Sequence, residues 1–319
     1  MGHSSLNLLI DAYSLLIRHY KANPAISRNG EHIGAVVGFL KNMERVIDRH
    51  RPDRVFVIWE GGGSQKKRSI YSDYKSRRKP AKMNHFFEEQ IFDSPQSRTR
   101  QTVLTVNFLR TTPVQQVYVS DCEADDVIGY LCKYALANED KLILSSDHDY
   151  YQLLDEKTRI CTFKRGLLIT KQNIVQEYNI SSSNFCLAKA ICGDRSDNIP
   201  GVRGAGYKTL AKRFPFLRED RDVLLEEIFN YSENYKNPKV KLYALINDNV
   251  DLIKRNWKLM YLDTQSLTSE QMNKIENFVK DYSPTSDKIG FIRKMIAEGF
   301  INFDADRFFL TMKPLTKIN

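Results

Sequence analysis

Cysteine is scarce in this 319-residue sequence, and its five cysteines form no Cys-x-x-Cys pair. An odd count without such pairs indicates neither a zinc site nor a disulfide framework, so we expect reduced thiols buried in the core. Runs of about 18 apolar residues, which a membrane-spanning helix requires, are also lacking, and no signal-peptide pattern opens the sequence. Internal repeats and low-complexity tracts are missing too. We therefore expect a soluble, cytoplasmic protein.

Negative charge is in deficit, with 39 Asp and Glu against 48 Lys and Arg, which gives a net charge of +9. The positive excess favours a polyanionic partner, and DNA or RNA is the leading candidate. With 42% apolar residues, the chain is long enough to bury a sizeable core in one large or two closely joined domains.

Apolar runs and helical patterns alternate along the first half of the chain. Short runs such as Leu-Leu-Ile before Asp11 and Val-Phe-Val-Ile-Trp before Glu60 suit strands that are buried on both faces. The expected strands end at Asp11 and cover 54–59, 116–119 and 141–145; the expected helices cover 12–20, 36–51, 99–109, 123–137, 239–247, 250–262 and 269–281. This order predicts an α/β fold, with a mostly parallel central sheet flanked by helices and a mainly helical C-terminal region.

Nine acidic residues fall where four apolar runs and one loop end. They are Asp11, Glu60, Glu123, Asp125, Asp126, Asp147, Asp149, Asp194 and Asp197. The carboxyl ends of parallel strands lie on one edge of a sheet, so acids far apart in sequence would meet there. Such a group would repel itself without cations, and hard divalent ions prefer oxygen ligands. The sequence therefore predicts a metal centre for Mg²⁺.

Each acidic segment also has a simpler interpretation. The acids of 123–126 could merely complement the dipole at a helix N-terminus, although Glu123 and Asp126 would share one helix face. The acids of 147–149 could lie in a solvated turn. Taken alone, the acids of 194–197 support a metal site less strongly than the acids at the strand ends do. His148 receives no role, because a loop histidine without an identified partner is more often solvated.

A strongly basic segment follows Glu60 and is expected to be an insertion spanning 61–97. Its cations are Lys66, Lys67, Arg68, Lys75, Arg77, Arg78, Lys79 and Lys82, interrupted by one acid and interleaved with Tyr71 and Tyr74. Cations neutralise phosphates and aromatic rings stack on bases, so we interpret the segment as a nucleic-acid contact rather than an ordinary solvated face. Lys75 or Arg78 could also stabilise charge on a phosphodiester in the transition state.

A glycine-rich segment covers 199–213. Gly201, Gly204 and Gly206 permit a tight hairpin whose backbone amides can approach phosphates, and Lys208 and Lys212 fall on one face of the helix that follows. These features predict a grip on the backbone of a duplex, with an ordinary turn between helices as the alternative. The spacing of a nucleotide P-loop is absent.

Three segments, in this order, resemble the motifs of the 5′ nuclease superfamily, the flap endonucleases and 5′-3′ exonucleases. They are Glu123-Ala-Asp125-Asp126, Ser146-Asp147-His148-Asp149, and Gly193 to Gly206, within a match from about residue 6 to 263. The resemblance is greatest to bacteriophage members related to the nuclease domain of bacterial DNA polymerase I.

The resemblance implies a PIN-like nuclease core over 6–180 that holds two Mg²⁺ ions, for which Mn²⁺ could substitute. One metal group would comprise Asp11, Glu60, Glu123 and Asp125, and the second, or the bridge, would comprise Asp126, Asp147, Asp149, Asp194 and Asp197. Tyr74 to Arg78 would open a helical arch for a single-stranded 5′ end. A helix-hairpin-helix module at 199–213, within a helical region 181–263, would grip duplex DNA and in relatives can hold K⁺.

Two residues depart from the family pattern: Glu60 stands where Asp is usual, and His148 replaces a small residue. Residues 264–319 match no motif, so the role of this extension is open. The resemblance implies a monomeric enzyme that cleaves DNA at 5′ ends, flaps and junctions in replication, with RNA primer–DNA hybrids as a further substrate. The enzyme would act in the host cytoplasm if it is a phage protein. A PIN-like ribonuclease and a junction-binding protein without catalysis are the alternatives.

Overall fold

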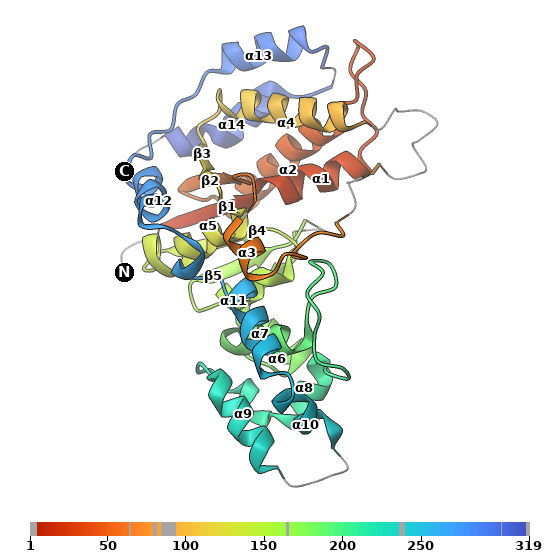
Figure 1. Ribbon diagram of the computed structural model, residues 1–319. Helices are drawn as coiled ribbons and strands as arrows, with labels where there is room; N and C mark the ends of the chain where they lie inside the picture. Colours follow the sequence, from red (N-terminus) through yellow and green to blue (C-terminus); the bar gives the residue numbers. More distant parts are fainter. Residues whose placement is uncertain are drawn as a thin grey trace.

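The computed structural model describes residues 5–63, 65–78, 82–83, 94–163, 166–235, 240–300 and 302–316. Its sheet has six strands in the order β3-β2-β1-β4-β5-β6 (Figure 1). These are β1 Leu6–Asp11, β2 Arg54–Trp59, β3 Gln115–Tyr118, β4 Asp140–Leu144, β5 Thr158–Cys161 and β6 Leu168–Ile169. Strands β1 to β5 pair in parallel, and β6 pairs antiparallel with β5. The predicted mostly parallel sheet is confirmed.

The central strands are buried on both faces. In β1, Leu8 and Ile10 belong to one apolar cluster, whereas Leu9 belongs to the cluster on the opposite face. Val55 and Phe56 of β2 divide in the same way. Successive side chains of a strand point to opposite faces, so a strand covered on both sides needs an uninterrupted apolar run. Each such side chain contributes about 1.5–3 kcal/mol on burial.

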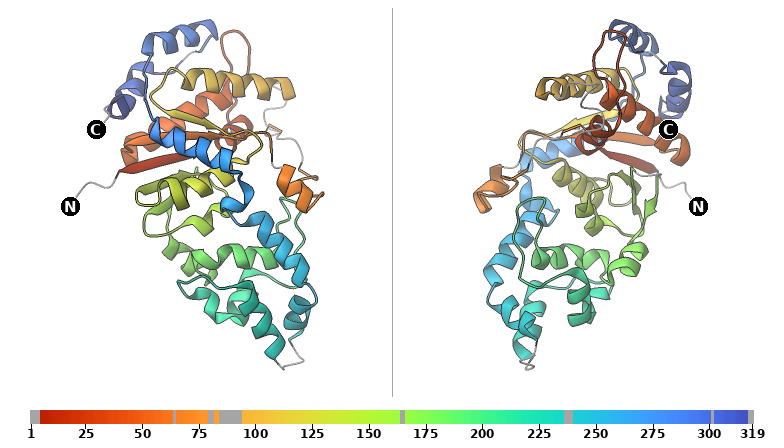
Figure 2. Two further views of the ribbon diagram at one scale, coloured as in Figure 1. Left: turned by 60° about the vertical axis from the view of Figure 1, so that its left-hand side comes forward. Right: turned by 90° about the vertical axis from the view of Figure 1, so that its right-hand side faces the viewer.

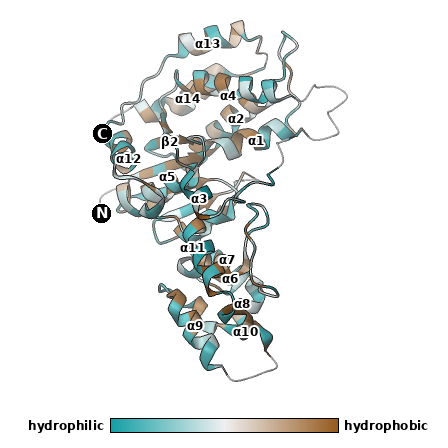
Figure 3. Ribbon diagram, viewed as in Figure 1, coloured by the Kyte–Doolittle hydropathy of each residue, from teal (hydrophilic) through white to brown (hydrophobic). Residues whose placement is uncertain are grey.

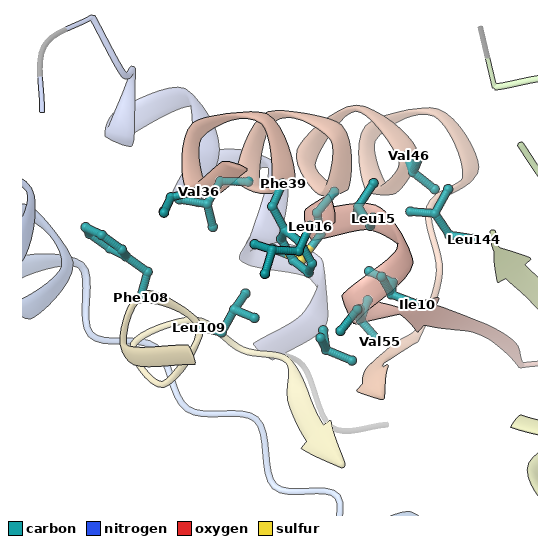
Figure 4. Packing of buried hydrophobic residues seen from close by; sticks show 14 of the residues in the cluster. Ile10, Leu15, Leu16, Val36, Phe39, Val46, Val55, Phe108, Leu109 and Leu144 are labelled. Atoms are coloured by element: carbon teal, nitrogen blue, oxygen red, sulfur yellow. The ribbon is translucent and has the colours of Figure 1, made fainter. Parts of the chain in front are cut away.

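One face of the sheet is covered by helices from both ends of the described chain. They are α1 Ala12–Ala22, α2 Gly34–His50, α4 Pro95–Leu109, α13 Lys288–Ala297 and α14 Ala305–Met312. Their apolar sides meet β1 and β2, and Figure 4 shows Leu16, Phe39 and Leu109 converging there. The helices α13 and α14 are thus part of the core on this face.

The opposite face is covered by a second group of helices. They are α5 Ala124–Tyr130, the π-helical turn η2 Leu131–Ala135, the 3₁₀ helix η3 His148–Leu153 and α12 Ser269–Lys280. Figure 3 shows apolar residues along the strands and polar residues on the outer sides of the helices. At the carboxyl edge of the sheet, α1 begins directly after Asp11 and η3 directly after Asp147, so these acids lie at the N-termini of helices.

A helical lower lobe, residues 171–260, extends from that edge. It comprises α6 Lys171–Tyr178, α7 Ser182–Cys192, α8 Tyr207–Arg213, η4 Pro215–Arg218, α9 Leu225–Asn234, α10 Lys241–Asn247 and α11 Val250–Met260. These helices enclose an apolar cluster of their own. In Figure 2, α11 leads back from the lower lobe to α12 beside the sheet.

Several predicted elements need correction. The helix expected over 123–137 ends at Tyr130 and continues as the π-helical turn η2. The sequence reasoning also missed β5, β6, the short helix α3 Gln65–Ile70, and both α13 and α14.

Four of the five cysteines are buried, and all five are free. Among the described residues, no helix has the length and apolar character needed to cross a membrane.

Candidate metal centre and nucleic-acid surface

Six of the nine predicted acids line one pocket of about 570 Å³ at the carboxyl edge of the sheet. They are Asp11, Glu60, Asp125, Asp147, Asp149 and Asp197. Asp11 is the last residue of β1, Glu60 follows β2, and Asp147 caps η3 after β4. A second pocket, of about 450 Å³, is lined by Asp147 and Asp194. The parallel sheet therefore brings these acids together as the strand ends predicted.

Asp11 is held in a fixed orientation. Its carboxylate accepts hydrogen bonds from Ser14 N at 3.1 Å, Ser145 Oγ at 3.2 Å and Tyr150 Oη at 3.2 Å. Burial raises the pKa of Asp11 to about 6, and the charge of Asp147 adds to the rise. Ionised Asp11 is thus destabilised by its surroundings, which favours binding of a positive ion.

Glu60 accepts a hydrogen bond from Ala124 N at 3.2 Å and also lines the pocket. Although part of its side chain is exposed, enclosure by the pocket wall and then the charges of Asp125 and Asp11 raise its pKa to about 8. The longer side chain therefore still places its carboxyl beside the other acids.

Glu123, Asp125 and Asp126 form a compact group whose carboxylate oxygens lie within 4.8 Å of one another. Lys67 Nζ lies 2.8 Å from Glu123 Oε2, 3.0 Å from Asp126 Oδ1 and 3.5 Å from Asp125 Oδ1. Lys67 is only 2% exposed. The expectation that it contacts DNA at the surface is therefore wrong for this structure, because its ammonium group neutralises buried carboxylates instead.

Glu123 has two further partners from the basic insertion. Lys75 Nζ lies 2.6 Å from Glu123 Oε1, and Tyr74 Oη donates to Glu123 Oε2 at 2.8 Å. Burial alone would raise the pKa of Glu123, but the ammonium groups of Lys67 and Lys75 outweigh it and lower the pKa to about 2. Tyr74 is 4% exposed and packs with Ile199, so it is not available to stack on a base as predicted.

Asp149, Asp194 and Asp197 form the second group with oxygens within 4.8 Å of one another. Lys189, on α7, contacts Asp149 and lies 2.7 Å from Asp194 Oδ2. Burial opposes ionisation of Asp194, but Lys189 and Ser196 outweigh it and lower its pKa to about 2. The sequence reasoning missed Lys189, although a lysine inside the apolar stretch 185–191 could have indicated a buried partner.

Asp197 is contacted from the basic insertion. Arg78 Nη2 lies 2.7 Å from Asp197 Oδ1, and Lys75 Nζ lies 4.0 Å from Asp197 Oδ2. Lys75 and Arg78 both line the main pocket. The two cations predicted to act in chemistry thus lie beside the acids, with Lys75 between the two acidic groups.

The acids provide the oxygen ligands that Mg²⁺ and Mn²⁺ prefer. Asp126 Oδ1 is buried and lies 3.0 Å from the Lys67 ammonium, so this oxygen already faces a positive charge. Asp126 lies with Glu123 and Asp125 rather than with Asp149, which differs from the grouping that the family resemblance implied.

The predicted hairpin follows α7 and leads into α8. A Cβ at Gly201 would lie 2.0 Å from Cys192 O, so this close backbone approach requires glycine, and Gly204 has φ +81°. Lys208 and Lys212 are exposed on α8, as are Lys66, Arg68, Arg77 and Lys82 in the basic insertion. Lys79 and most of the remaining insertion lie outside the described residues.

The model of a family described as "5′-3′ exonuclease, N-terminal resolvase-like domain" matches residues 6–179. The chain belongs to the 5′-3′ exonuclease family. A 5′-3′ exonuclease of Halalkalibacterium halodurans is 29% identical over 290 residues, covering 86% of this chain and 89% of the relative. DNA polymerase I of Streptococcus pneumoniae is 32% identical over 251 residues, but these are 76% of this chain and 26% of the polymerase. The predicted superfamily and nuclease class are confirmed.

Solved structures of proteins similar to this 5′-3′ exonuclease family member share its fold. The bacteriophage T5 D15 flap endonuclease, crystallised with DNA and metal ions, has a TM-score of 0.68 at 17% identity, covering 87% of this chain and 98% of that one. Human GEN1 with Holliday junction DNA has a TM-score of 0.54 at 13% identity, covering 98% of this chain and 72% of that one. At these identities the likeness concerns the fold.

Proposed function

We propose that this protein is a metal-dependent 5′-3′ exonuclease and structure-specific flap endonuclease, which hydrolyses phosphodiesters at 5′ ends and at junctions of single- and double-stranded DNA. The observation that carries the proposal is the convergence of six acids with Lys75 and Arg78 on one pocket. Family membership and the flap-endonuclease fold support the same reaction.

The residues that would hold two Mg²⁺ ions are Asp11, Glu60, Asp125, Asp147, Asp149, Asp194 and Asp197, with Glu123 and Asp126 behind them. Such ions, when bound, lower the pKa of water and stabilise a leaving oxygen. Mn²⁺ is the proposed substitute.

The cations of this chain have separate tasks. Lys75 and Arg78 line the pocket and would neutralise the scissile phosphate, at the place where charge develops during hydrolysis. Lys67, buried behind them, serves as a fixed counter-charge that limits repulsion among Glu123, Asp125 and Asp126. Asp11, oriented by three donors, keeps its carboxylate directed at the pocket.

The DNA path is proposed from exposed cations on two sides of the pocket. The basic insertion offers Lys66, Arg68, Arg77 and Lys82, and α8 offers Lys208 and Lys212. We assign the insertion over 61–97 to an arch for the single strand and 199–213 to a helix-hairpin-helix grip on the duplex, with K⁺ at the hairpin. RNA primer–DNA hybrids are included as substrates, and the protein would act as a monomer in the cytoplasm.

The deciding assay is cleavage of a 5′-flapped duplex, labelled at each end in turn, with Mg²⁺ or EDTA. We expect Mg²⁺-dependent cutting near the flap junction. A matched single-stranded RNA serves as the comparison, since cutting of RNA alone would favour a PIN-like ribonuclease. High-affinity binding of the DNA junction without cleavage in Mg²⁺ or Mn²⁺ would favour a non-catalytic junction-binding protein. The reason to consider this alternative is Glu60, which departs from the family pattern.

A further inference from the structure

Two residues in adjoining loops beside the pocket have left-handed backbone conformations. Lys75 has φ 57° and Asn198 has φ 60°, a region that residues other than glycine rarely occupy. Lys75 lies in the turn 71–78 after α3, and Asn198 lies in the loop 194–199 between α7 and the hairpin. Such conformations persist only where the surrounding contacts enforce them.

Hydrogen bonds between the two loops bracket Lys75. The Asn198 side-chain amide donates to Asp73 O at 2.9 Å and to Ser76 Oγ at 3.2 Å. Between these two points, Lys75 N donates to Asp197 O at 2.9 Å. The turn is therefore fixed before and after Lys75, while the Lys75 side chain extends to Glu123 at 2.6 Å.

The loop that carries Asn198 is itself firmly anchored. Asp194 and Ile199 exchange two backbone hydrogen bonds of 2.8 Å and 2.7 Å, which close the loop. Its exit is held by the fully buried Asn256 of α11, whose amide donates to Ala190 O at 2.9 Å and Pro200 O at 2.7 Å. The turn around Lys75 thus rests against a rigid base, and that base continues directly into the hairpin.

We propose that Asn198 is a positioning residue of the nuclease: its amide holds the 73–76 turn in the conformation that places Lys75 between the acidic groups. Asn198 does not line either pocket, so it acts through Lys75 rather than on the substrate. Because Pro200 and Gly201 follow it, the same loop connects the duplex grip to the cation at the scissile phosphate. This inference rests on the proposed nuclease function.

The test begins with Asn198→Gly, which keeps the left-handed backbone accessible and removes the amide. At saturating enzyme, single-turnover cleavage of a 5′-flapped duplex should slow by about tenfold or more, as displacement of a catalytic group does. The Kd for the duplex should be unchanged. The matched control is Asn179→Gly, which makes the same replacement at φ 55° on the C-terminal cap of α6 and should cleave at the unsubstituted rate.

A double-mutant cycle with Lys75→Ala separates positioning from a structural effect. If Asn198 acts through Lys75, adding Asn198→Gly to Lys75→Ala causes little further loss. The same fold-loss on both backgrounds, a normal rate for Asn198→Gly, or equal slowing by Asn179→Gly would overturn the proposal.

Asn198→Asp provides a second variant should the glycine variant not fold. It retains the size and the tolerance of left-handed backbone but lacks the donated hydrogens, and it should show the same loss of rate; a normal rate would overturn the proposal. Absence of cleavage by the unsubstituted protein in Mg²⁺ and Mn²⁺ would instead overturn the nuclease function on which the role of Asn198 depends.

Discussion

Replacing Lys67 by Met will destabilise the metal-free protein and make its stability depend strongly on divalent ions. The Lys67 ammonium lies within 3.5 Å of Glu123, Asp125 and Asp126, and its side chain is almost completely buried. Methionine has a similar length but removes this ammonium from Asp125 and Asp126 and leaves Glu123 with Lys75.

Removing one partner of a buried ion pair costs about 3–5 kcal/mol, because the remaining charge is buried without compensation. At about 2–4 °C per kcal/mol for a chain of comparable size, the Tm should fall by about 6–20 °C. A ligand at 100 times its Kd restores about 2.7 kcal/mol. Excess Mg²⁺ should therefore recover about half or more of the loss in the variant, because the ion replaces the missing ammonium.

Thermal unfolding with EDTA and with Mg²⁺ measures both effects. Lys66→Met is the matched control, since it removes the same charge from the exposed neighbouring position. The reasoning is refuted if Lys67→Met leaves the Tm in EDTA unchanged, or if Mg²⁺ raises the Tm of the variant no more than that of the unsubstituted protein.

Three further measurements examine the site and the DNA surface. The pKa of Glu60 is raised from 4.5 to about 8, so the stability that Glu60 contributes is complete below pH 4.5 and is lost as the pH rises to about 8. In EDTA, Glu60→Gln should therefore flatten the fall of Tm with pH, and the same slope of Tm against pH in the variant and the unsubstituted protein would contradict this prediction. Asp147→Ala should abolish cleavage and leave the Kd for DNA unchanged, whereas lost binding with an intact fold would exclude Asp147 from chemistry. Replacing Lys208 and Lys212 by Ala should weaken duplex binding and reduce the slope of log Kd against log salt by about 1.8, at 0.9 per phosphate; an unchanged slope would remove α8 from the interface.

Local sequence patterns were sufficient for the four strands β1 to β4 and for the pocket at their carboxyl edge, but not for β5 and β6. The run ending at Trp59 predicted β2 with its observed bounds, because burial on both faces demands an uninterrupted apolar segment. Asp11, Glu60 and Asp147 then followed from the rule that parallel strands end on one edge.

The buried lysines could not be predicted in the same way. Lys67 meets Glu123 across 56 positions, and Lys189 meets Asp149 across 40 positions. A lysine in a basic segment has the same local pattern whether it faces solvent or a carboxylate, so only the tertiary structure separates Lys67 from the exposed Lys66. The π-helical end of α5 likewise depends on packing, and its sequence reads as ordinary helix.

The C-terminal helices have a consequence for how the protein assembles during synthesis. Phe291, Phe308 and Leu315 complete the same apolar cluster that contains Leu8 and Ile10 of the first strand. All nine acids have been synthesised by residue 197, yet one face of the sheet that aligns them waits for about a hundred further residues. A nascent chain that ends after the hairpin would hold every predicted metal ligand but lack Phe291 and Phe300, which cover Phe108 in the folded protein.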